Sequence, residues 1–145
     1  MSVKMKIAFV CVGNTCRSPM AMFILKDELK RRKIKGVAVT SYGLNPTEKE
    51  INPYAKRELE KLNVKITAFK PKKLTKSSAL KQSAIIAVTE DVFKELSVNQ
   101  IKNAYSFEQL FGCGLDVCYP AENKGVYDAI LKSGGLLVSE YKPDV

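Results

Sequence analysis

The fold of this chain is decided by one stretch, Val10-Cys11-Val12-Gly13-Asn14-Thr15-Cys16-Arg17-Ser18-Pro19. Before it, Ile7 to Val12 is a short apolar run of β-forming residues, which predicts a buried parallel strand. After it, from Pro19 to about Ile34, apolar residues recur at helical spacing among Lys and Arg. Ser18 is a suitable N-cap, and Pro19 suits the first turn of a helix. The stretch therefore predicts a strand–loop–helix unit.

The same alternation of strands and helices continues along the chain. Further strands are expected at Val37–Ser41, Ala84–Val88 and Ile101–Phe107, and further helices at Ile51–Leu62, Glu90–Leu96 and Val126–Tyr141. Alternating strands and helices predict a single α/β domain, residues 1–145, with a parallel sheet. Folds of this kind bind their ligands at the carboxyl ends of the strands, where the loop after Val10 lies.

The composition is that of a globular domain, with 46% hydrophobic and 27% charged residues. The net charge of +9 favours anionic partners, namely phosphorylated or acidic substrates. Nucleic acid is not expected, because the lysines are spread along the chain and form no basic block. Met1 to Lys6 is too polar and too short for a signal peptide, and no apolar run has the length of a membrane span. A cytoplasmic location is therefore predicted.

The chain has four cysteines, Cys11, Cys16, Cys113 and Cys118. Without a signal peptide, reduced thiols with a catalytic or redox role are expected rather than structural disulfides. Four residues separate the members of each pair and the chain has no His, whereas structural zinc sites use tighter spacings. Neither a metal nor an organic cofactor is expected.

The loop after the first strand has the properties of a phosphate-binding site. A strand–loop–helix turn supplies backbone amides and the positive end of a helix dipole, which together favour an anion. Gly13 and Asn14 are the residues best able to adopt the dihedral angles that such a loop needs. Arg17 adds a planar fork for two phosphate oxygens. The predicted phosphate-binding residues are Val12, Gly13, Asn14, Thr15, Cys16, Arg17 and Ser18.

Cys11 is the candidate nucleophile at the base of this loop. Inward amides, the helix N-terminus and Arg17 all favour a thiolate over a thiol. Ser18 can donate a hydrogen bond to that thiolate and later help it to leave. A thiolate beneath a bound phosphate is placed for in-line attack on phosphorus. The simpler alternative is that Cys11 is only a small buried apolar residue at a strand end.

The string from Val10 to Pro19 resembles the signature of low-molecular-weight protein tyrosine phosphatases and of the arsenate reductases that share their fold. Thr40-Ser41-Tyr42-Gly43 resembles the Ser-Ala-Gly segment of that family. The resemblance implies a four-stranded, twisted parallel sheet flanked by helices. It implies hydrolysis of protein phosphotyrosine, or of a small phosphomonoester, through a phosphocysteine intermediate. It also implies that Ser41 hydrogen-bonds Asn14, and that a reversible Cys11–Cys16 disulfide protects the nucleophile.

The chain departs from the family at the general acid. The family carries an Asp-Pro pair on a late loop, whereas here Tyr119 precedes Pro120. Three alternatives remain open: Asp116 serves as the acid, Tyr119 serves poorly in its place, or no dedicated acid exists. Asp116 is the expected acid, and Tyr119 is a possible wall of the substrate cleft.

Two other functions compete with phosphatase activity. A thiol-coupled arsenate reductase would need further cysteines, and Cys113 and Cys118 lie later in the chain than that chemistry usually requires. A phospholigand-binding module without turnover would explain the missing Asp-Pro pair. It would not explain a cysteine at the base of the loop.

Overall fold

The computed structural model describes residues 5–31, 33 and 35–107 of the chain. Its strands are β1 (Met5–Cys11), β2 (Val37–Gly43), β3 (Ala84–Ala87) and β4 (Ala104–Ser106). They form one parallel sheet in the order β2-β1-β3-β4, so the predicted four-stranded parallel sheet is confirmed. The predicted helix Val126–Tyr141 lies outside the described residues.

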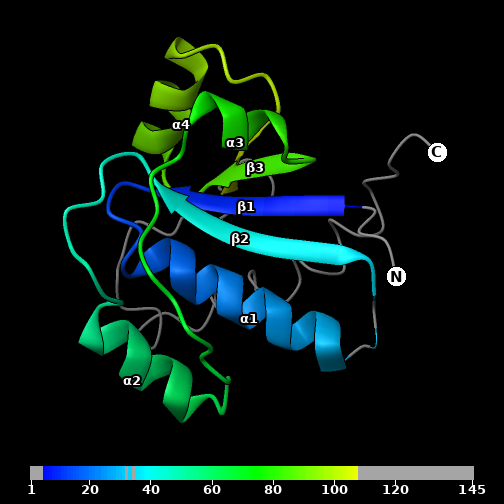
Figure 1. Ribbon diagram of the computed structural model, residues 1–145, viewed down its shortest axis with the longest axis vertical. Coiled ribbons are helices and arrows are strands. Elements are labelled where there is room, and N and C mark those ends of the chain that lie inside the picture. The colour runs from blue at the N-terminus through cyan, green and yellow to red at the C-terminus, as the bar shows by residue number, and fades with distance from the viewer. Residues whose placement is uncertain (1–4, 32, 34, 108–145) are drawn as a thin grey trace.

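Helices cover both faces of this sheet. The described helices are α1 (Arg17–Arg31), α2 (Pro53–Lys61), α3 (Lys76–Leu80) and α4 (Glu90–Val98). Figure 1 shows α1 and α2 on one face, and α3 and α4 on the other. Within the described part of the chain, no helix is long and apolar enough to cross a membrane.

The start of α1 differs from the prediction. The helix begins at Arg17, so Ser18 lies inside its first turn and is not its N-cap. The reason is that the Cys16 carbonyl already accepts a helical hydrogen bond from the Met20 amide, at 3.0 Å. This extension leaves the Ser18 hydroxyl available to the loop.

β1 is the central element of the core because it is buried on both faces. Its side chains alternate, with Ile7 and Phe9 packing in the cluster beneath α1 and Ala8 and Val10 in the cluster beneath α4. Ile7, Phe9 and Val10 are 0% exposed. Burying each such side chain contributes roughly 1.5–3 kcal/mol, so β1 is a rigid support for the loop that follows it.

Residues 64–73, called the strap below, connect α2 to α3 and run past α1 to the end of β2. The Phe69 ring of the strap packs edge-on against Phe23 of α1, with ring centroids 5.9 Å apart. At the other end, the Gly43 amide donates to the Lys72 carbonyl at 2.8 Å. The strap is thus fastened to both the helix and the sheet.

Candidate active site

Residues 11–18, called the P-loop below, lie at the carboxyl end of β1. Cys11 is the last residue of β1, and the loop runs directly into α1. Two backbone amides from the segment after β2 donate to its outer side, Leu44 to the Cys11 carbonyl at 3.0 Å and Asn45 to the Val12 carbonyl at 2.9 Å. The Asn52 amide donates to the Thr15 carbonyl at 2.8 Å. These bonds occupy three of the loop's carbonyls, those of Cys11, Val12 and Thr15.

Asn14 holds the loop in shape from inside. Its φ of 56° is left-handed, a conformation that Asn tolerates better than most residues, and the side chain is 0% exposed. Its Oδ1 accepts from the Lys72 amide of the strap at 2.9 Å, and its Nδ2 donates to the Ser18 hydroxyl at 2.9 Å. Because the Lys72 amide can only donate, the orientation of the Asn14 side-chain amide is fixed.

The Cys11 sulfur receives two polar contacts and is otherwise buried. The Asn14 amide donates to Sγ at 3.2 Å, and the Ser18 Oγ lies 2.9 Å from Sγ. Since Ser18 already accepts from Asn14, its own proton is free to point at the sulfur. Cys11 is 3% exposed. A negative charge on Sγ would therefore meet two donors and little water, as a nucleophile beneath a phosphate requires.

The mouth of the loop presents groups that suit an anion. In the described chain, the amides of Gly13 and Thr15 donate to no backbone acceptor, and α1 points its N-terminus at the loop. Arg17 is the first residue of α1 and shares that turn. The predicted phosphate-binding residues 12–18 therefore form one loop, which ends in the first turn of α1.

Gly13 and Gly43 differ from expectation. Gly13 was predicted to share the unusual dihedral angles of the loop, but its φ is not positive, and Asn14 alone in the P-loop is left-handed. Gly43 at the end of β2 was not predicted as a site residue. A Cβ there would lie 2.7 Å from the Val12 carbonyl oxygen and 3.0 Å from the Asn14 Cβ. Gly43 therefore lets β2 approach the P-loop. The sequence could have indicated this role, because residues 41–43 resemble the Ser-Ala-Gly segment of the family, which also ends in glycine.

The predicted hydrogen bond from Ser41 to Asn14 is wrong. Ser41 is 0% exposed and close to the loop in register, but its Oγ has no hydrogen-bond partner. The Asn14 side chain is instead bonded to Ser18 and to the strap amide of Lys72. The strap supplies the support that was expected from β2.

The reversible Cys11–Cys16 disulfide that the family resemblance implies is not present in this structure and stays a prediction. Cys11 is a free, buried thiol, whereas Cys16 is disulfide-bonded. The expectation of reduced cysteines is therefore wrong for Cys16. The remaining predicted site residues, Asp116 and Tyr119, lie outside the described residues, as do Cys113 and Cys118.

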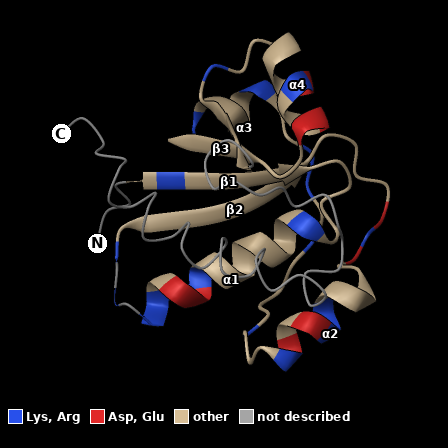
Figure 2. Ribbon diagram, turned by 180° about the vertical axis from the view of Figure 1, so that it is seen from behind, with Lys and Arg blue, Asp and Glu red and all other residues tan. Residues whose placement is uncertain are grey.

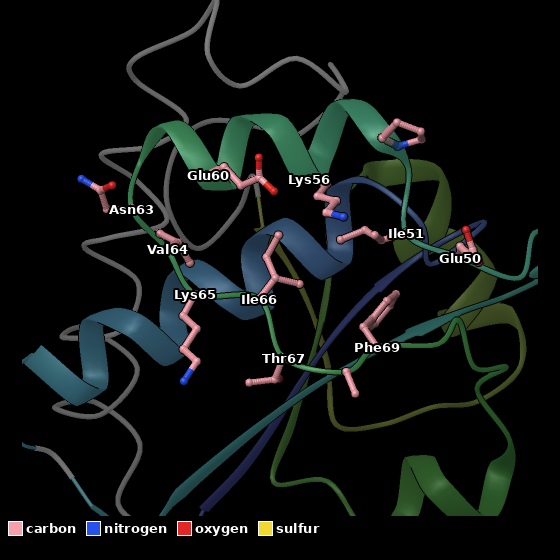
Figure 3. A pocket seen from close by; sticks show the side chains of 12 residues that line it. Glu50, Ile51, Lys56, Glu60, Asn63, Val64, Lys65, Ile66, Thr67 and Phe69 are labelled. Carbon is pink, nitrogen blue, oxygen red and sulfur yellow. The ribbon is translucent and has the colours of Figure 1, made fainter.

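Two cavities flank α2, and only one includes the P-loop. A cavity of about 610 Å³ is lined by Thr15 and by residues 47–53, among them Glu48 and Glu50. A larger one, about 910 Å³, lies between α2 and residues 63–69; Figure 3 shows Val64, Ile66 and Phe69 along its lower side. The larger cavity contains no P-loop residue. The smaller one is the candidate space for the rest of a substrate whose phosphate sits in the loop.

A cysteine and an arginine in such a loop, at the end of the first strand of a parallel sheet, define a cysteine-dependent phosphatase site. The family model for "Low molecular weight phosphotyrosine protein phosphatase" matches residues 6–113. The chain belongs to this family. The family match does not favour the arsenate reductase alternative.

The chain is also similar to individual proteins that are named as phosphatases. The low molecular weight protein-tyrosine-phosphatase PtpA of Staphylococcus saprophyticus is 54% identical over 37 residues, which cover 26% of this chain and 24% of the relative. The matched part thus spans about a quarter of that relative's length. The YwlE arginine phosphatase of Geobacillus stearothermophilus has a TM-score of 0.79 at 25% identity, with 94% of each chain covered. A YwlE mutant from Bacillus subtilis has a TM-score of 0.81 at 21% identity, covering 92% of this chain and 99% of that one.

Proposed function

We propose that the chain hydrolyses phosphomonoesters, with protein phosphotyrosine as the first candidate substrate and Cys11 as the nucleophile. The observation that carries this proposal is the pair of donors on the Cys11 sulfur, the Asn14 amide at 3.2 Å and Ser18 at 2.9 Å. A cysteine kept only for packing would need neither donor. A reactive thiolate needs both, because burial would otherwise destabilise its charge. A cytoplasmic location is part of the proposal.

The proposed reaction has two displacements at phosphorus. The phosphate group binds to the loop amides and Arg17, and the Cys11 thiolate attacks phosphorus as the P–O bond to the leaving group breaks. Water then attacks the phosphocysteine, releasing phosphate and the thiolate. Ser18 stabilises the thiolate at the start and at the end of this cycle, because its Oγ lies 2.9 Å from Sγ and can donate a hydrogen bond to the charged sulfur. Val12, Gly13, Asn14, Thr15 and Cys16 supply the backbone of the phosphate site.

Asp116 is the proposed general acid that protonates the leaving oxygen and later activates the water. Support comes from the sequence alone, since Asp116 is the nearest carboxylate that precedes Pro120 on the late loop. Tyr119 is proposed as a wall of the substrate cleft.

The test is steady-state hydrolysis of a phosphotyrosyl peptide across pH, with wild type, Cys11→Ser and Asp116→Asn side by side. Turnover that disappears in Cys11→Ser and drops in Asp116→Asn would support both assignments. Equal phosphate release by wild type and Cys11→Ser would overturn the proposal. A binding module without turnover would then be the better account, provided that phosphopeptide still binds to wild type.

Phosphoarginine is a second candidate substrate, favoured by two observations. The Geobacillus YwlE relative, at 25% identity across nearly the whole chain, is named an arginine phosphatase. The cavity beside Thr15 is lined by Glu48 and Glu50, with Lys49 between them. Neither glutamate forms an ion pair with another described residue, so the two carboxylates would attract a cationic guanidinium group next to the phosphate.

Matched peptides separate the two substrates. Phosphotyrosine and phosphoarginine are placed at the same position in one peptide sequence, and kcat/KM is measured for each. If phosphoarginine is the substrate, Glu48→Gln combined with Glu50→Gln should lower its kcat/KM more than that of phosphotyrosine. The remote variant Glu95→Gln on α4 serves as the control, and equal effects on both substrates would refute the guanidinium argument.

A further inference from the structure

A third cavity, of about 540 Å³, lies between α1 and the strap and contains no P-loop residue. Phe23 and Phe69 form part of its wall, and their rings pack against each other. Three lysines also line the cavity: Lys26 comes from α1, and Lys70 and Lys72 come from the strap. Residues that are dispersed in the sequence are therefore gathered around one partly apolar hollow.

The positive charge of this cavity is not neutralised by the described residues. None of its described lining residues is acidic, and none of the three lysines forms an ion pair with a described carboxylate. The nearest acids along α1, Asp27 and Glu28, instead pair with Arg31, at 3.0 Å and 2.8 Å. Burial lowers the pKa of the Lys26 ammonium, and the charge of Lys72 lowers that pKa further.

The two interacting lysines also rest on aromatic rings. The Lys26 Nζ lies 5.7 Å from the Phe23 ring centroid, and the Lys72 Nζ lies 5.2 Å from that of Tyr42. A ring face attracts a cation but adds no negative charge to cancel it. Lys26, Lys70 and Lys72 are exposed, and an anion entering between them would gain attraction from several charges at once.

We propose that this cavity, called the lysine pocket below, binds a small organic phosphate, whose phosphate group lies among Lys26, Lys70 and Lys72 and whose apolar body lies against Phe23 and Phe69. A phosphate dianion carries two negative charges and a carboxylate only one, so phosphate is the better ligand for a group of three ammonium ions. The rings and the volume suit a ligand with a ring of its own. The site is separate from the P-loop and would be occupied independently of it.

The strap gives the lysine pocket a physical connection to the P-loop. Lys72 contributes its side chain to the pocket, while its backbone amide donates to Asn14 Oδ1 at 2.9 Å. A ligand in the pocket would therefore contact the same residue whose backbone supports Asn14.

Pyridoxal 5′-phosphate is a suitable probe, because it combines a phosphate, an aromatic ring and an aldehyde. Its aldehyde carbon forms an imine with an unprotonated lysine Nζ, releasing water, and borohydride reduces the imine to a stable amine. Labelled lysines are then located by peptide mass spectrometry at substoichiometric probe. We expect the label to concentrate several-fold on Lys26 or Lys72 over other exposed lysines, and to do so equally in Cys11→Ser.

Matched variants and a matched probe test the role of the phosphate group. Lys70→Gln should reduce labelling of Lys26 several-fold, whereas Lys30→Gln, on the same helix but outside this pocket, should leave it unchanged. Pyridoxal, which lacks the phosphate, should lose the preference. Label spread evenly over the exposed lysines, or the same pattern with pyridoxal, would overturn the proposal. Neither readout depends on phosphatase activity, so the proposed function can fail while this site stands.

Discussion

Asn14 shows how much of the active site depends on single side chains. One amide accepts from the strap and donates to Ser18, whose Oγ lies 2.9 Å from the Cys11 sulfur and can donate to a thiolate there. This chain of hydrogen bonds forms only if each group keeps its role as donor or acceptor. Isosteric changes at these buried positions should therefore lower turnover and also cost stability.

Ser18→Ala removes one of the two donors on the Cys11 sulfur. A hydrogen bond to a charged group contributes about 1.5–3 kcal/mol, so kcat should fall about 10- to 100-fold. Turnover of a phosphotyrosyl peptide measures the loss, with Ser97→Ala on α4 as the control. Unchanged kcat in Ser18→Ala would show that the sulfur needs no second donor.

Gly43→Ala should disturb the P-loop although residue 43 lies outside it. The added Cβ would meet the Val12 carbonyl at 2.7 Å, and backbone cannot move aside as a flexible side chain can. Overpacking of this kind costs about 1–3 kcal/mol, measurable as a lower free energy of unfolding in urea. Gly13→Ala is the matched control, because its Cβ would meet only Thr15 Oγ1 at 3.6 Å. Equal stability of the two variants would contradict the argument.

At the scale of elements, the caps and the strap position the site. α2 begins after Asn52, whose Oδ1 accepts from the Tyr54 amide at 2.8 Å and whose own amide holds the Thr15 carbonyl. The end of the P-loop is therefore joined directly to the start of a helix. α3 is capped by Thr75 and Ser78, which donate and accept reciprocally.

Asn52→Ala should destabilise the protein by about 0.5–2 kcal/mol, the usual cost of losing an N-cap side chain. The free energy of unfolding in urea measures the change. Asn99→Ala, at the C-terminal end of α4, should cost less because its side chain is exposed and bonds only the Glu95 carbonyl. An equal or larger loss in Asn99→Ala would argue against a special role for the Asn52 cap.

The strands and longer helices were predictable because their apolar periods are strong. β1, β3 and α1 follow directly from buried runs and helical spacing. α3 was missed because it has only 5 residues, too few for a period, and its signal is the Thr75 cap. The strap was missed because its support of Asn14 comes through a backbone amide, which every non-proline residue has. Because a backbone donor leaves no mark in the sequence, the family resemblance pointed to the Ser41 side chain as the partner of Asn14, which is wrong.

At the scale of the whole molecule, the net charge of +9 is distributed over many elements. Figure 2 shows Lys and Arg on β1, α1, α2 and α4, with acidic residues interspersed mainly on the helices. Such a field attracts anionic substrates from a distance without specifying where they bind. The place of binding is determined by the P-loop, where backbone amides and Arg17 are held together at one site.

The distributed charge predicts that capture of a phosphopeptide depends on salt. Raising sodium chloride to about 0.15 M shortens the Debye length to about 8 Å, so kcat/KM should fall several-fold from its low-salt value. At saturating substrate, kcat should change little because capture no longer limits the rate. A kcat/KM that is constant or rises with salt would show that long-range attraction plays no part.

The hydrogen bond between the Lys72 amide and Asn14 joins positions 58 residues apart. During synthesis the cysteine and arginine of the loop emerge first, yet the contact that fixes their geometry awaits a segment made much later. A nascent chain that ends before the strap would carry the complete signature and still lack its catalytic shape. The order of translation therefore delays the appearance of a reactive thiol until the first three strands and the strap can assemble around it.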